Sequence, residues 1–152
     1  MDVKMINPFI GAVSGIMPQI GFTSVSRKGI SLKDKKFIVN GVVLTLGIVG
    51  DKKGNVVYSI DMEGAKKIAS TMMMGMPVDE LDEMAKSALS ELSNMLTANA
   101  SINFSNDGIN VDISVPTMMF GEEIEVNLQK DNIICIEFDI DGISLHVNIA
   151  LD

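Results

Sequence analysis

Two alternating segments near the C-terminal end of the chain, joined by Asp141-Gly142, limit the possible folds more than any other feature. Apolar residues occupy every second position from Ile134 to Ile140 and from Ile143 to Leu151. Such alternation predicts half-buried strands, and Asp-Gly between two of them is a strong signal for a two-residue hairpin. Strands with one covered and one wetter face are typical of antiparallel sheets. We therefore expect an antiparallel sheet.

The same alternation predicts further strands at 23–33, interrupted at Gly29, and at 42–48, 56–60, 109–115 and 123–128. The loop 50–55 makes a hairpin of the second and third of these.

Helical spacing of apolar residues predicts three helices. The first covers 3–17 and is closed by Pro18 and Gly21. In this stretch Asn7 caps a helix that starts at Pro8, or Pro8 kinks a longer helix. The second covers 64–74. The third is long, with Asp79 as its N-cap, the acids Glu80, Asp82 and Glu83 in its first turn, and its end between residues 99 and 105.

The two halves of the chain resemble each other. Residues 7–12 align with 94–99 at an offset of 94 − 7 = 87, and 42–61 align with 133–152 at an offset of 133 − 42 = 91. One loop insertion accounts for the difference. We expect a single domain over 1–152 of the α+β class, with long helices packed on a largely antiparallel sheet built from two pseudo-repeated α-βββ halves.

Composition excludes several classes of function. The formal net charge is −8, which argues against nucleic acid and against attachment to an anionic membrane. No apolar run approaches the roughly 18 residues that span a bilayer. One cysteine and one histidine exclude an intrachain disulfide and a His-rich metal centre. Twelve methionines include the clusters Met72–Met74 with Met76, and Met118-Met119, which we expect mainly to fill the core.

The long helix carries the candidate site. Its predicted core stripe is made of Leu81, Met84, Ala85, Ala88, Leu89, Leu92, Met95 and Leu96. A carboxylate and a carboxamide, Glu91 and Asn94, lie beside this stripe, one turn apart. The small residues Ser87 and Ala98 share their flank, so that a partner could approach closely. The competing interpretation is a solubilising charge, although Glu91 has no cation at i±3 or i±4.

Three segments carry a resemblance to a known family. They are Ser90-Glu91-Leu92-Ser93-Asn94-Met95 on the long helix, Val115-Pro116-Thr117 through Gly121 after one strand, and Asn7-Pro8-Phe9 near the N-terminus. In this order they resemble the CheX branch of the CheC/CheX/FliY phosphatases of bacterial chemotaxis, over essentially the whole chain.

The resemblance implies a cytoplasmic enzyme that hydrolyses the aspartyl phosphate of a CheY-like receiver. Asn94 is expected to position the attacking water, as the glutamine of GTPases does, and Glu91 to dock the receiver's lysine. Ser87, Ser90 and Ala98 are expected to contact the partner. No cofactor of its own is expected, because Mg²⁺ belongs to the receiver. The alternatives are a non-catalytic module that binds receivers or serves in a flagellar switch, and a receiver phosphatase outside chemotaxis.

The resemblance also bears on the first half and on assembly. CheC-type members can carry two sites, but here Lys4 stands where the second half has Glu91, so we expect one site. We expect Asn7 to be a helix cap or a buried hydrogen-bonding residue. CheX relatives dimerise by pairing sheets, and the long alternating strand 143–151 has neither proline nor lysine to protect it as an open edge. A homodimer through that strand is therefore expected.

Other chemistry is not favoured. Cys135 lies among isoleucines in a predicted strand, where an inert buried thiol is expected. His146 alternates with apolar residues and is expected on the outer face or at a sheet interface. Glu137, Asp139 and Asp141 share one strand face but stand about 7 Å apart, which favours a solvated acidic face over a Ca²⁺ site.

Overall fold

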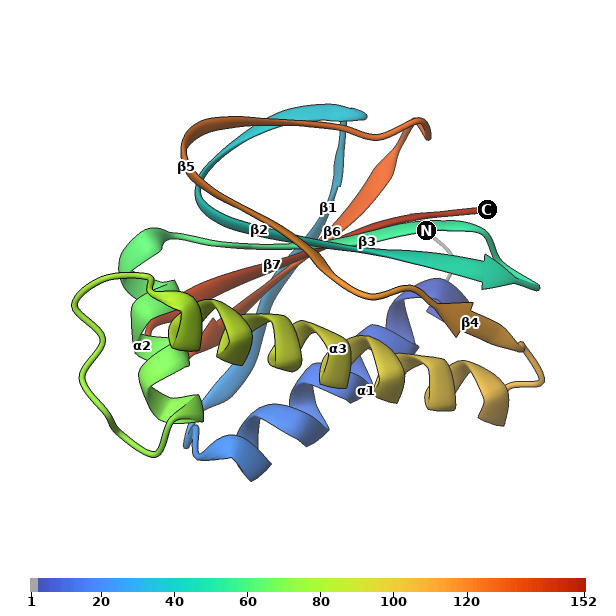
Figure 1. Cartoon of the computed structure of the whole chain (residues 1–152). Coiled ribbons are helices and arrows are strands. Elements are labelled where there is room, and N and C mark those ends of the chain that lie inside the picture. The colour runs from blue at the N-terminus through green and yellow to red at the C-terminus, as the bar shows by residue number, and fades with distance from the viewer. Residues whose placement is uncertain (1–2) are drawn as a thin grey trace.

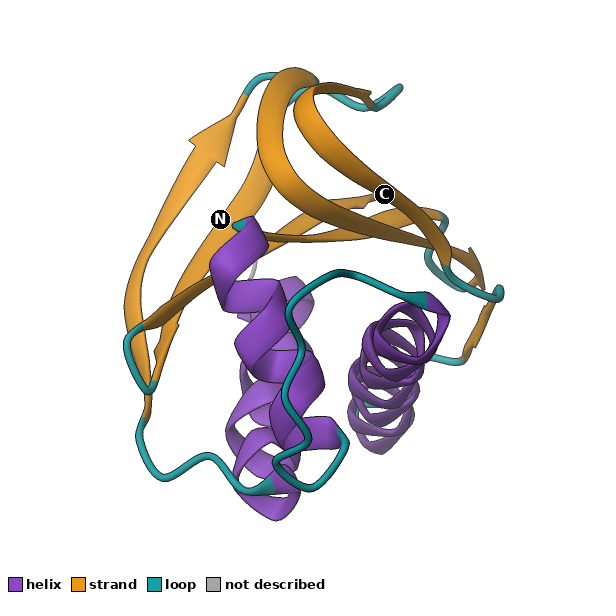
Figure 2. Cartoon of the chain, turned by 60° about the vertical axis from the view of Figure 1, so that its left-hand side comes forward, coloured by secondary structure: helices purple, strands orange, loops and turns teal. Residues whose placement is uncertain are grey.

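The computed structural model describes residues 3–152, which form three helices and one seven-stranded sheet. The helices are α1 (Val3–Ile20), α2 (Met62–Met72) and α3 (Glu83–Asn106). The strands are β1 (Val25–Lys33), β2 (Lys36–Gly50), β3 (Gly54–Ile60), β4 (Val111–Ile113), β5 (Thr117–Asn127), β6 (Ile133–Ile140) and β7 (Ile143–Leu151). The helices cover one face of the sheet, and β2 and β5 curl away over the other (Figures 1 and 2). The α+β expectation is confirmed.

The strand order reveals the duplication. The strands run β1-β6-β7-β3-β2, with β4 and β5 both paired to β2, and every pair is antiparallel. With β5 at the end the order is β1-β6-β7-β3-β2-β5, and exchanging β1, β2 and β3 with β5, β6 and β7 gives the same order read from the opposite end of the sheet. Adding the offset of 91 to 42–60 gives 133–151, the span of the β6–β7 hairpin. Two α-βββ halves therefore share one sheet, as predicted, and β4 is an addition to the second half.

The predicted turns are present. Asp141 and Gly142 have φ values of 50° and 86°, and positive values at both positions are what a two-residue type I′ hairpin requires. The interruption predicted at Gly29 is a shift of register between Arg27 and Gly29, where β1 pairs with β6.

The expectation that β7 is an open edge is wrong. β7 lies between β6 and β3 and pairs with both. Its near-continuous burial reflects cover on both faces of the sheet, since Leu145 and Val147 pack in the main core and Ala150 in a second cluster on the other face. The sheet ends instead at β1 on one side and at β4 and β5 on the other.

Two helices begin at positions other than those predicted. The N-cap of α3 is Asp82, whose carboxylate accepts the N–H of Ala85 at 2.9 Å, so Asp79 and Glu80 lie in the preceding loop and only Glu83 is in the first turn. Helix α2 starts two residues early because the Asp61 carboxylate caps it. In both cases the residue whose side chain reaches the third backbone N–H ahead decides the start.

Helix α1 follows the second of the two alternatives for its start, a longer helix that contains Pro8. It begins at Val3 and passes through Pro8, so Asn7 is inside the helix and exposed. The prediction that Asn7 is a cap or a buried hydrogen-bonding residue is therefore wrong. The chain turns after α1 at Gly21, whose φ is 130°.

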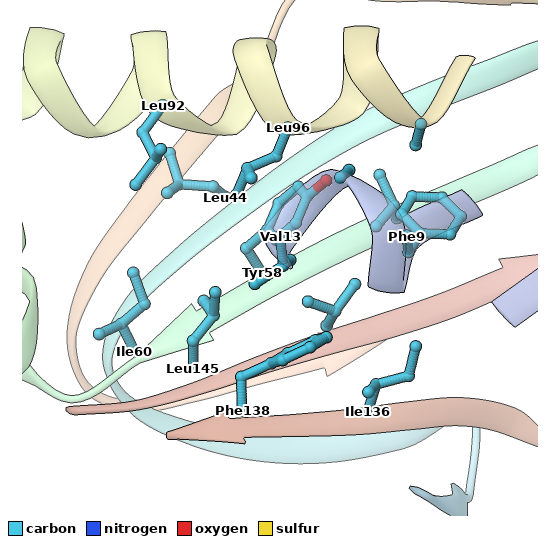
Figure 3. Packing of buried hydrophobic residues seen from close by; sticks show 14 of the residues in the cluster. Phe9, Val13, Leu44, Tyr58, Ile60, Leu92, Leu96, Ile136, Phe138 and Leu145 are labelled. Carbon is cyan, nitrogen blue, oxygen red and sulfur yellow. The ribbon is translucent and has the colours of Figure 1, made fainter. Parts of the chain in front are cut away.

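The main core lies between the helices and the sheet (Figure 3). Phe9 of α1 and Phe104 of α3 meet edge to face, with ring centroids 5.8 Å apart, and tie the two long helices together. A second cluster fills the other face of the sheet under the curled parts of β2 and β5; it comprises Val43, Val57, Ile124, Val126, Leu128, Ile133 and Ala150.

The methionines only partly fill the core. Met72, Met73 and Met118 pack against it, but Met76 and Met119 are exposed and Met74 is 97% exposed. Core filling is thus wrong for these last three. Met74 and Met76 follow the end of α2, where the chain turns at Gly75.

Gly54 offers a direct test of how closely the central strands approach. Its φ is 147°, and a Cβ there would lie 1.9 Å from the carbonyl oxygen of Ala150. We expect Gly54→Ala to lower the free energy of unfolding by about 3 kcal/mol, the upper end for overpacking. The measurement is denaturant unfolding.

The matched control is Gly15→Ala, on the exposed face of α1 with no atom within 4 Å of the added Cβ. It is expected to raise stability by about 0.8–1 kcal/mol through helix propensity. Equal effects of the two substitutions would contradict the close approach of β3 to β7.

Candidate active site

Helix α3 is held on the sheet by an apolar stripe close to the predicted one. Ala85, Leu89, Leu92 and Leu96 are buried as expected. Met84 is exposed, Met95 is half-buried, and Leu81 packs on the core from the loop before the helix. The buried face continues instead through Ser93, Thr97, Ala100 and Phe104. Compared with the predicted stripe, the buried face of α3 is therefore rotated towards Ser93 and Thr97, two hydroxyl residues that the apolar periodicity did not include.

A chain of hydrogen bonds satisfies these buried hydroxyls. The Ser93 hydroxyl donates to the carbonyl of Ser90 at 2.8 Å, and the Thr97 hydroxyl to the carbonyl of Ser93 at 2.7 Å. Since the Thr97 proton is used in this way, the Tyr58 hydroxyl is the donor in the 2.8 Å contact between Tyr58 and Thr97. Burial raises the pKa of Tyr58 above its usual range, so this donor keeps its proton.

The opposite flank of α3 borders an open groove of about 560 Å³. Its helical side carries Glu83, Lys86, Ser87, Ser90, Glu91 and Asn94. The facing wall is the segment that leads from β4 into β5 and contributes Val115, Pro116, Met118 and Phe120. The predicted acid, amide and two serines are thus brought together in one place. Ala98 is half-buried one turn further along and lies outside the groove lining.

Glu91 and Asn94 are available to a partner. Glu91 is exposed and Asn94 half-buried, and neither side chain has a hydrogen-bond or ion-pair partner among residues 3–152. Lys86, the lysine in the groove lining, is engaged elsewhere: its Nζ lies 3.4 Å from an oxygen of Glu83 and 4.4 Å from the centre of the Phe120 ring. A carboxylate and an amide therefore face solvent together, able to accept a cation and to hold a water.

The facing wall was not identified from the sequence as part of a site. Its signal was present, because Pro116, Met118 and Phe120 alternate, and alternate residues of an extended chain point to one side. Lys86 was likewise not identified from the sequence, because its contact with the Phe120 ring joins segments far apart in the chain.

The corresponding position of the first half, as far as residues 3–152 show it, has different surroundings. Lys4 and Asn7 are exposed on α1, and Asn7 borders a hollow of about 300 Å³ whose lining comes from α1 and the end of α3. No strand contributes to that lining. Lys4 and Asn7 correspond to Glu91 and Asn94. This first-half pair thus has a lysine in place of the acid, and no strand faces it in the lining of the hollow.

The other candidate residues serve the fold. Burial raises the pKa of the Cys135 thiol, which lies 3.6 Å from Nδ1 of His146 on the outer face of the sheet. Burial also lowers the pKa of His146. The Asp141 carboxylate accepts the backbone N–H groups of Thr23 and Ser24, which lowers its pKa. Asp139 accepts the N–H of Gly142 in the hairpin.

The chain resembles known proteins along most of its length. A family model described as "Chemotaxis phosphatase CheX" matches residues 42–139. The CheY-P phosphatase CheX of Thermotoga maritima is 33% identical over 127 residues, covering 83% of this chain and 81% of that protein. No helix of residues 3–152 is long and apolar enough to cross a membrane.

Solved structures share the fold. A CheC-like superfamily protein from Shewanella has a TM-score of 0.88 at 22% identity, covering 100% of this chain and 99% of that one. CheX in the CheX–CheY–BeF₃–Mg²⁺ complex from Borrelia burgdorferi has a TM-score of 0.80 at 24% identity, covering 97% of each. The family match over more than half of the chain and the identity with the Thermotoga protein lead to one conclusion: this chain belongs to the CheX family of chemotaxis phosphatases.

Proposed function

We propose that this chain hydrolyses the aspartyl phosphate of a CheY-like receiver, in the cytoplasm where such receivers act. The observation that carries the proposal is the pairing of Glu91 and Asn94, one turn apart in an open groove and without partners in residues 3–152. The Thermotoga relative is named a CheY-P phosphatase, and the Borrelia structure is a complex of CheX with CheY, which supports this substrate.

The proposed reaction needs little from this chain beyond positioning. Water attacks phosphorus, the bond from phosphorus to the receiver's aspartate oxygen breaks, and the products are the free carboxylate and inorganic phosphate. An amide can both donate and accept hydrogen bonds, so Asn94 can hold the water in line with the breaking bond. Glu91 pairs with the receiver's lysine and fixes the docked register. Mg²⁺ enters as part of the receiver substrate.

Asn94→Ala is expected to lower kcat for phosphate release by roughly 10²–10³, the usual cost of one well-placed polar group at a transition state. Folding and receiver binding should be retained, because the Asn94 side chain has no partner in the described structure. The measurement is release of phosphate from a receiver phosphorylated with acetyl phosphate. The control is Asn7→Ala, the corresponding amide of the first half, which should leave kcat unchanged.

If Asn94→Ala releases phosphate as fast as the parent chain, Asn94 does not position the water. Equal large losses in both variants, with unchanged melting temperatures, would show a two-site enzyme. Tight binding by the parent chain without phosphate release would favour the non-catalytic module instead.

Glu91→Ala is expected to raise KM as well as lower kcat, because its proposed partner is a lysine across the interface. Glu91→Lys should do worse through like-charge contact. The parent's kcat/KM should fall with added salt more steeply than that of Glu91→Ala. Glu63→Ala on α2 is the control, since Glu63 is an exposed acid outside the groove lining and is paired with Lys66. An unchanged kcat/KM in both Glu91 variants would place Glu91 outside the interface.

We further propose that the chain forms a homodimer by sheet pairing, with β1 as the contact in place of β7. Among residues 3–152, β1 pairs with β6 alone, so its other edge is open to a second copy. At the opposite end of the sheet, the first half of β5 lines the groove. Light scattering should give the mass of a dimer, and Leu32→Glu, which puts a charge at an exposed position of β1, should give a monomer. A parent chain that is monomeric at every concentration would refute this.

A further inference from the structure

Apolar side chains gather on the groove wall, and two of them, Val115 and Phe120, belong to neither core cluster. Val115 is 81% exposed and Phe120 is 48% exposed, and Met118 lines the same wall. Single exposed apolar residues are common on protein surfaces and need no explanation. Here, however, they share one groove with Glu91 and Asn94. An apolar surface that adjoins polar groups in this way is typical of a binding site.

One cation is held against this wall. The Lys86 ammonium lies over the Phe120 ring and beside the Glu83 carboxylate, and its side chain is 29% exposed. A flexible lysine loses conformational freedom when it binds. The ring and the carboxylate restrict Lys86 before any partner arrives, so the groove holds an ammonium group, paired with Glu83, at a defined place next to an apolar surface.

The chemistry of the substrate indicates what this wall meets. An aspartyl phosphate is part of a protein surface, so whatever delivers it to Asn94 also brings protein against the facing wall. The phosphoryl group is anionic, and this chain carries a net charge of −8, so long-range electrostatics do not favour the encounter. Apolar contact together with one fixed cation supplies attraction without additional negative charge.

We propose that Val115 and Phe120 form a docking surface for an apolar patch beside the phosphorylated aspartate of the receiver, and that Lys86 contacts an acidic group at the rim of that patch. This rests on the proposed function and names the part of the groove that determines affinity for the receiver. Phe120 acts in two ways, as an apolar anchor and as the support that positions Lys86. Glu91 and Asn94 remain the residues that meet the phosphorylation site itself.

Phe120→Ala and Val115→Ser test the docking surface with two measurements. The first is KM and kcat for a CheY-type receiver phosphorylated with acetyl phosphate. The second is Kd for the same receiver carrying beryllofluoride and Mg²⁺. We expect each variant to raise KM and Kd about tenfold, as truncation of an interface anchor does, with kcat at saturation within about twofold of the parent. Lys86→Met should weaken binding most at low salt.

Matched controls exist on other elements. Phe37→Ala removes the ring beneath the other stacked lysine, Lys33, whose Nζ lies 4.6 Å from the ring centre. Ile38→Ser replaces an aliphatic residue of β2 that is 56% exposed. Both should bind the receiver like the parent. Because Val115 is so exposed, Val115→Ser is expected to fold even if Phe120→Ala does not, and thermal melts check both.

The outcomes separate this inference from the proposed function. If the parent chain releases no phosphate, the proposed function is wrong. The Kd for the receiver carrying beryllofluoride and Mg²⁺ then still tests the docking surface. An active parent with unchanged KM and Kd in Phe120→Ala and Val115→Ser overturns the docking surface alone. So does a loss of kcat without a change in Kd. A loss of self-association in Val115→Ser, with receiver binding intact, would assign the wall to a second copy and refute the proposal.

Discussion

The apolar contact between α3 and the sheet decides where the polar residues of this helix lie. Leu89, Leu92 and Leu96 are buried, so the helix cannot rotate without exposing them to water. The hydrogen bond from Tyr58 to Thr97 lies inside this contact and adds a direction that apolar packing lacks. Glu91 and Asn94 therefore reach solvent at one defined place. Preorganisation of this kind is what the water-positioning role proposed for Asn94 requires.

The two halves have the same strand order but different surfaces. In the second half, β4 stands between α3 and β5, and Ser114 after it is bonded to Gly47 of β2 in both directions, through its backbone N–H and its hydroxyl. This anchor carries residues 115–118 along the flank of α3. In the first half the chain passes from α1 through a short turn into β1, with no such insertion. In the described part of the chain, the duplicated architecture thus gives the two long helices different surroundings, because the segment that faces α3 belongs to the second half.

Charge within the groove is arranged to keep one acid available. Lys86 is satisfied by Glu83 and by the Phe120 ring, which leaves Glu91 without a cation among residues 3–152. A surface carboxylate ordinarily contributes little to stability whether paired or not. Its value for recognition is larger, because an unpaired acid can accept a lysine from a partner without first losing one of its own. The buried face of α3 therefore serves the fold, and the flank that carries Glu91 serves the proposed interface.

The sequence by itself determined the local elements and the placement of Glu91 and Asn94 beside each other on one flank of the long helix. Alternation and Asp141-Gly142 predicted the hairpin, and helical spacing placed Glu91 and Asn94 beside a buried stripe, because both depend on periods of two and 3.6 residues. Periodicity carries no information about which strands become neighbours, and for that reason β7 was expected at an edge although it is central. Nor did it show that residues 115–120 face α3, since that contact joins segments more than twenty residues apart. Tertiary structure decided the strand order, the wall and the position of Lys86, because each depends on packing between distant parts of the chain.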